Sequence, residues 1–177
     1  MKRFNTTGTC IPGRHYMVDT TSKLNQITEL INQEEYFTIN RSRQYGKTTT
    51  ISLLKRTLKT RMQVISISFE GIGDEPFNTN AAFVRIFIEL CSDYFRFTKI
   101  EKADADKWND ISDFNEEKPF KYLSGKITDL CEKYEIVLMI DEMDKCSDNQ
   151  VFLNFLGMLR DKYLLRNAGK DFTFKSV

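Results

Sequence analysis

The segment YFTINRSRQYGKTTT (residues 36–50) decides the fold, because a short strand pattern runs directly into a glycine-lysine-threonine triplet. Such a triplet closes the phosphate-loop pattern G-x-x-x-x-G-K-[ST], which lies between a strand and a helix. Gly46, Lys47 and Thr48 match this pattern, whereas Arg41 stands where the first glycine is usual. A Gly-Lys-Ser/Thr triplet occurs by chance in roughly one chain in ten of this length. The context must therefore decide.

The residue types of this loop suit phosphate chemistry. Backbone N–H groups of the loop and of the following helix converge on phosphate oxygens, and Gly46 lets the backbone approach them closely. Lys47 can neutralise the β- and γ-phosphates, and the Thr48 hydroxyl can ligate Mg²⁺. The candidate nucleotide-binding residues are Arg43, Gln44, Tyr45, Gly46, Lys47, Thr48 and Thr49.

Two arginines of the loop need separate weighing. Arg43 can contact phosphate or a neighbouring chain, and pairing with a nearby acid agrees equally well with the sequence. Arg41 costs some of the backbone freedom that glycine gives at the loop entrance. It removes no phosphate contact that the chemistry requires, so it affects loop shape and affinity more than the identity of the motif.

A second motif is the segment EIVLMIDE (residues 135–142), a continuous apolar run that ends in two acids. This pattern predicts a strand buried on both faces. Because the carboxyl ends of parallel strands share one edge, Asp141 and Glu142 are expected beside residues 41–48. Asp141 would hold Mg²⁺, and Glu142 would polarise the attacking water, with Lys47 as the second catalytic residue. The alternative is a pair of acids that end a strand and face solvent.

The rest of the chain alternates between strand and helix patterns. Strands are predicted at residues 36–40, 63–69 and 136–140, with the beginning of another at residues 171–177. Helices are predicted from residue 20 or 21 onward, at residues 47–59, within residues 80–97, and at residues 120–133 and 149–166. This alternation predicts an α/β fold with a mainly parallel sheet covered by helices on both faces. Residues 1–35 would form an N-terminal segment and helix before the phosphate loop.

Length and composition exclude several classes of protein. The chain has 177 residues, enough for one domain, and is 41% hydrophobic and 29% charged. No segment approaches the ~20 apolar residues that cross a bilayer, so no membrane partner is expected. The N-terminus lacks the apolar core of a secretory signal, which predicts a cytoplasmic location. Four scattered cysteines without a C-x-x-C pair, and a single histidine, argue against a zinc site.

The charge is unevenly distributed although the net charge is only +1. Residues 1–61 hold eleven Lys/Arg against four Asp/Glu. A basic first third can indicate nucleic acid binding. Several of these cations cluster around the candidate phosphate loop, which explains the charge more locally. Nucleic acid is therefore neither indicated nor excluded as a partner, and salt-sensitive DNA binding would support it.

These residues resemble those of the AAA-like ATPases of bacteria, a branch of the P-loop ATPases. The resemblance spans nearly the whole chain and covers RFNTTGTCIPGRHYMVD (residues 3–19), the loop segment, VLMIDEMDK (residues 137–145) and FLGMLRDKYL (residues 155–164). In that group the first loop glycine is often replaced, and the Arg-x-Arg-Gln lead into Gly-Lys-Thr is similar to the version found there. Arg41 to Thr48 then correspond to Walker A, and Ile136 to Glu142 to Walker B.

The resemblance implies an additional-strand P-loop fold with the strand order 5-1-4-3-2. Residues 36–40 would be the first strand, 63–69 the second, 136–140 the third, and 171–177 the fourth at the centre of the sheet. The fifth strand is absent. Residues 1–177 would thus be an AAA-like P-loop ATPase domain that is incomplete at its C-terminus.

The resemblance also implies ATP hydrolysis with Mg²⁺. The alternative is a nucleotide-dependent switch or scaffold, which binds ATP with little hydrolysis and changes its contacts with a protein partner or with another copy of itself. The sequence allows this alternative because neither a sensor residue nor an arginine finger can be identified in it.

Overall fold

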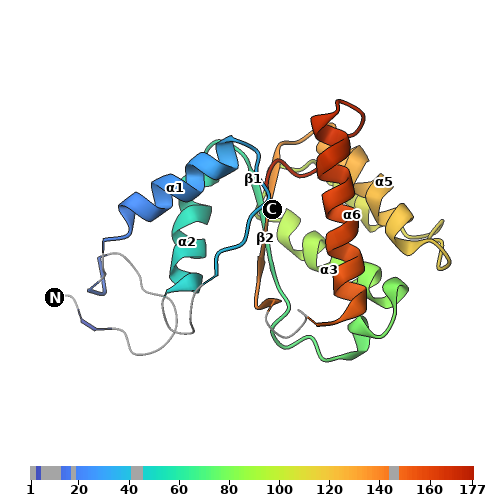
Figure 1. Ribbon diagram of the computed structural model, residues 1–177, viewed down its shortest axis with the longest axis horizontal. Helices are drawn as coiled ribbons and strands as arrows, with labels where there is room; N and C mark the ends of the chain where they lie inside the picture. Colours follow the sequence, from blue (N-terminus) through green and yellow to red (C-terminus); the bar gives the residue numbers. More distant parts are fainter. Residues whose placement is uncertain (1–2, 5–12, 17–18, 41–45, 144–147) are drawn as a thin grey trace.

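The computed structural model describes residues 3–4, 13–16, 19–40, 46–143 and 148–177 (Figure 1). The candidate loop residues Arg41, Arg43, Gln44 and Tyr45 lie outside these ranges. The described residues form six α-helices, two strands and one short 3₁₀ helix. In chain order these are α1 (Thr21–Asn32), α2 (Lys47–Leu58), β1 (Gln63–Ser68), η1 (Glu75–Phe77), α3 (Asn80–Phe95), α4 (Lys102–Asn109), α5 (Pro119–Cys131), β2 (Ile136–Asp141) and α6 (Gln150–Asn167).

The two strands pair in parallel and lie between two groups of helices. Gln63 is opposite Ile136 and Ser68 is opposite Asp141, so the two strands match along their whole length. In Figure 1, α1 and α2 lie on one side of the strands, and α3, α5 and α6 lie on the other. The predicted α/β class, with parallel pairing and helices on both faces, is confirmed.

Side chains of the two strands alternate between two hydrophobic clusters. Val64 and Val137 pack into a small cluster with α1 and α2. Ile65 and Leu138 pack into a larger cluster with α3, α5 and α6. Because successive strand residues point to opposite faces, odd-numbered positions of β2 face α1 and α2. By the same alternation Asp141, the last residue of β2, is on the face that α2 covers.

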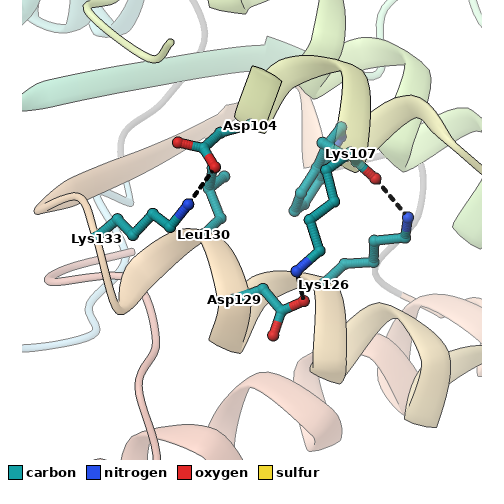
Figure 2. Close-up of a pocket in the computed structure, with 7 residues that line it drawn as sticks. Asp104, Lys107, Lys126, Asp129, Leu130 and Lys133 are labelled. Carbon is teal, nitrogen blue, oxygen red and sulfur yellow. Dashed lines mark hydrogen bonds and ion pairs between the residues drawn. The ribbon is translucent and has the colours of Figure 1, made fainter. Parts of the chain in front are cut away.

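Helix α4 was not predicted from the sequence, and it docks through one aromatic residue and two ion pairs. The buried Trp108 indole donates a hydrogen bond of 3.0 Å to a backbone carbonyl of α3. Figure 2 shows α4 joined to α5, with Lys133 Nζ 2.5 Å from Asp104 Oδ1 and Lys107 Nζ 2.7 Å from Asp129 Oδ2. Both cations are paired with carboxylates here, so this hollow serves as a structural clamp.

Two predicted strands do not form as strands. Residues 36–40 carry no strand, and residues 171–177 form a single isolated parallel bridge, Ser176 with Val137. Leu138 N–H donates to the Ser176 carbonyl at 3.0 Å, and Phe37 N–H donates to the Val177 carbonyl at 3.0 Å. A strand needs a continued ladder with a neighbour, and these contacts stop after one or two bonds. The paired sheet is therefore smaller than predicted.

Helix α6 holds the C-terminal segment in place. Lys162, only 1% exposed, lies with its Nζ 2.7 Å from Asp171 Oδ2. Arg166 donates to the Phe174 carbonyl at 2.8 Å and to the Glu34 carbonyl at 2.7 Å. These contacts fix the segment that precedes residues 36–40 and the segment that ends at Val177 against the same helix. None of the helices in the described ranges combines the length and apolar character that crossing a lipid bilayer requires.

Candidate functional site

A cleft of about 840 Å³ opens between residues 36–40 and the second half of β2. Much of its lining is apolar and comes from α1, α2, β2 and α6. Polar side chains also line it, among them Lys47, Asp141 and Glu142. Three residues that the sequence singled out, from two motifs far apart in the chain, therefore lie around one cleft.

Lys47 is positioned by the start of α2. Gly46 immediately precedes this helix with φ of 76°, a left-handed conformation that favours glycine. The Thr50 N–H and hydroxyl both donate to the Gly46 carbonyl at 2.9 Å, which fixes the first turn. The first N–H groups of a helix lack intrahelical partners, and Gly46 has no side chain to cap them. The helix dipole adds partial positive charge at this end, which suits an anion.

The other described loop residues are Thr48 and Thr49, in the first turn of α2. Thr48 is exposed and Thr49 is half-buried, and the lining of the cleft includes neither of them. The structure thus brings Lys47 together with the two acids and leaves both threonines just outside the lining. The predicted site residues Arg43, Gln44 and Tyr45 lie outside the described residues.

The two acids lie at the carboxyl end of β2 in a constrained arrangement. Glu142 N–H donates to Asp141 Oδ1 at 3.0 Å. Glu142 has φ of 57°, which is uncommon for a residue with a side chain. Such strained conformations persist where the surroundings enforce them and are concentrated at functional sites. Both side chains are half-buried, so neither is simply an acid on an open surface.

Arg160 of α6 also lines this cleft, and the sequence analysis did not single it out. It lies four residues from both Leu156 and Leu164, which line the cleft with it. Residues at this spacing share one helix face. An arginine in the middle of an otherwise apolar helix face is the sequence signal that could have identified it.

The oxygen donors of this region fit a magnesium ion that arrives with a nucleotide. Among the described residues, no group of three or more His, Cys, Asp or Glu side chains is arranged to hold a metal. Two candidate donors are the Asp141 carboxylate and the Thr48 hydroxyl. Mg²⁺ keeps several waters and takes one or two carboxylates together with substrate phosphates. A sparse donor set therefore suits Mg²⁺ bound to phosphate better than a resident metal ion.

The chain matches the model of one protein family, described as the AAA-like domain, over residues 11–173. This range includes the described start of α2, both strands and α6. No curated protein matches the chain, and no solved structure does. The family match therefore covers every described residue that lines the cleft except those after residue 173.

Proposed function

The chain belongs to the family of AAA-like domains, and from this premise we propose that it binds ATP with Mg²⁺ at the cleft and hydrolyses it. The observation that carries the proposal is the meeting of Lys47, Asp141 and Glu142 around one cleft. A cation at a helix start and two acids at the end of a parallel strand are the groups that phosphoryl transfer requires.

The phosphates would bind at the start of α2. Gly46 keeps this helix end uncapped by any side chain, and its first N–H groups can donate to phosphate oxygens. Lys47 supplies a full positive charge at the same point, and it lines the cleft. Arg160 is a second cation in the lining and would add to the attraction for a polyanion.

Thr48 and Asp141 would hold the Mg²⁺ ion. When bound, the ion bridges β- and γ-phosphate oxygens and neutralises the charge that develops on them. The position of Asp141 supports this role, because strand alternation places it on the face of β2 that α2 covers. Thr48 is exposed in the first turn of α2, so its hydroxyl remains accessible to an arriving ion.

Glu142 would act as the general base that accepts a proton from the attacking water. The bond from its N–H to Asp141 Oδ1 couples its orientation to that of the metal ligand. A positioned general base contributes typically 10²–10⁴-fold to a rate. Its left-handed backbone supports a role that depends on direction, because a purely structural residue at this strand end has no need of that conformation.

The partial pairings also support the P-loop strand order. Tyr36 and Phe37 adjoin Val177, Ser176 bonds to β2, and β2 pairs with β1. Read across the sheet, these segments follow the order first, fourth, third, second. This arrangement agrees with a P-loop fold in which residues 171–177 approach the centre of the sheet.

Equilibrium titration with ATP tests the proposal, followed by the release of phosphate under single turnover. We expect saturable ATP binding that weakens when EDTA removes Mg²⁺, and slow release of phosphate that also requires Mg²⁺. Binding without phosphate release would favour the nucleotide-dependent switch over the enzyme. Absence of binding by protein that circular dichroism shows to be folded would contradict both.

A further inference from the structure

The burial of β2 changes abruptly along its length. Ile136, Val137 and Leu138 are at most 2% exposed. Met139 and Ile140 are equally apolar but only half-buried. The change falls where the pairing with residues 175–177 ends, because Ser176 bridges Val137 and Leu138 makes the last bond to that segment. The second half of β2 therefore lacks a neighbour that its first half has.

The direction of the backbone groups shows which side of β2 is open. The Glu135 and Asp141 carbonyls accept hydrogen bonds from the β1 side, at 3.0 and 3.3 Å. Leu138 N–H instead donates to Ser176, away from β1. Hydrogen-bonding groups of a parallel strand alternate in direction along the chain, so the Leu138 C=O and the Ile140 N–H both point away from β1. Neither bonds to another described residue.

The opposite wall shows the same pattern. Phe37 N–H donates to the Val177 carbonyl. By the same alternation the Phe37 C=O and the Ile39 N–H face the side on which Val177 lies. No hydrogen bond joins residues 38–40 to the rest of the described chain. Two rows of unpaired backbone groups therefore border one cleft, an arrangement that invites another strand.

The cleft lies in line with the C-terminal segment. Figure 1 places the C-terminus between β2 and the segment that precedes α2, and the bonds of Ser176 and Val177 to the two walls agree with this position. The walls beyond that point are mainly apolar, with Ile39, Met139 and Ile140 among the residues that line them. A segment entering here would continue a pairing that already exists.

We propose that this cleft seats an extended polypeptide strand that continues the path of residues 175–177, parallel to β2. The register follows from the bridge between Ser176 and Val137. The first position after Val177 would bond to the Leu138 C=O and the Ile140 N–H. The second would bond to the Phe37 C=O and the Ile39 N–H, and the third would stand opposite Asp141.

The side chains of this strand would be apolar at its first two positions. One would face the cluster beneath α1 and α2, and the next would face the cluster beneath α6, because each neighbouring position of β2 alternates between these clusters. Beyond the third position the strand would reach the polar end of the cleft, where Asp141 and Lys47 lie. The strand and a bound phosphate would therefore occupy different parts of the cleft.

Extensions attached to Val177 test this assignment without any nucleotide. We compare the unmodified chain with chains extended by Val-Ile-Val-Ser, by Gly-Ser-Gly-Ser and by Pro-Ile-Val-Ser. Proline at the first position lacks the N–H that would bond to the Leu138 C=O. Hydrogen exchange at the Ile140 and Ile39 amides is the readout, since both amides would become donors to the added strand.

We expect Val-Ile-Val-Ser to slow exchange at both amides by about tenfold or more, whereas the Gly-Ser and proline extensions leave both rates near those of the unmodified chain. Equal rates in all four chains would overturn the proposal. Concentration-dependent protection in the unmodified chain, accompanied by dimers in analytical ultracentrifugation, would also overturn it, because a second copy would then fill the cleft. These outcomes do not depend on ATP binding.

Discussion

The backbone N–H of Glu142 lies 3.0 Å from Asp141 Oδ1, and the same residue holds a left-handed φ of 57°. The side chain of one acid thus bonds to the backbone that directs the other. A constrained pair of this kind can keep two carboxylates in different roles, one as a metal ligand and one as a base. This relationship leads to the first prediction.

Replacing Glu142 by Gln should leave ATP binding nearly unchanged and slow hydrolysis by roughly 10²-fold or more. The amide keeps the shape of the side chain but cannot accept a proton from water. Single-turnover release of phosphate measures the chemical step directly. Glu132→Gln, at an exposed position after α5, is the matched control and should not alter the rate. Equal turnover by Glu142→Gln and the parent chain would show that Glu142 is not the base.

Replacing Lys162 by Met should lower the free energy of unfolding by roughly 3 kcal/mol, the lower end of the range for a broken buried ion pair. The side chains of Lys162 and Asp171 are only 2% and 13% exposed, so the unpaired Asp171 carboxylate would be left largely desolvated. Urea denaturation provides the measurement. Lys107→Met breaks a pair with exposed side chains, 65% and 51%, and should cost less than about 1 kcal/mol. Similar losses in the two variants would refute the interior role of Lys162.

Acid should weaken the fold partly through Asp171. Burial alone would raise the pKa of this carboxyl, but hydrogen bonds from Lys162 and Thr128 outweigh it and hold the pKa below its ordinary value. The unfolded chain has an Asp pKa of about 3.9, so the stabilisation is fully present above that pH. It is lost as the pH falls through the lower pKa of the folded state.

The free energy of unfolding should therefore fall more steeply below about pH 4 in the parent chain than in Asp171→Asn. Denaturation curves at several pH values between neutrality and pH 3 compare the two chains, and the remaining carboxyl groups contribute equally to both. Parallel pH profiles would mean that Asp171 has the same pKa in the folded and unfolded states.

Arg166→Lys tests whether α6 holds together the two segments beside β2. The guanidinium donates to the carbonyls of Glu34, Phe174 and Lys175 at 2.7 to 2.9 Å. A single ammonium group cannot reproduce this fork, so we expect a loss of about 1–3 kcal/mol in unfolding free energy. Arg85→Lys changes only an exposed pair and should be nearly neutral. A neutral Arg166→Lys would contradict the role of this contact.

Local patterns in the sequence predicted the elements whose neighbours are present. Alternating β-branched residues identified β1, and the apolar run before Asp141 identified β2. The triplet at Gly46 correctly placed the start of α2 at Lys47. Topology explains why Lys47 and the two acids could be expected near one another, since carboxyl ends of parallel strands share an edge.

Features that depend on tertiary contacts were harder to predict. Residues 36–40 have a strand-like sequence, but one hydrogen bond to Val177 does not make a ladder. Helix α4 escaped prediction because its sequence is polar and its anchor, Trp108, is its one buried residue. Arg160 looks like an ordinary surface residue until the packing of α6 places it at the cleft.

Equilibrium binding of ATP with Mg²⁺ to the parent chain and to Lys47→Ala tests the central claim most directly. Arg56→Ala is the matched control, because it removes one positive charge from the exposed face of the same helix. We predict saturable binding by the parent chain and by Arg56→Ala, and its loss or near loss in Lys47→Ala. Retained affinity in a folded Lys47→Ala variant would contradict the assignment of this cleft as the nucleotide site.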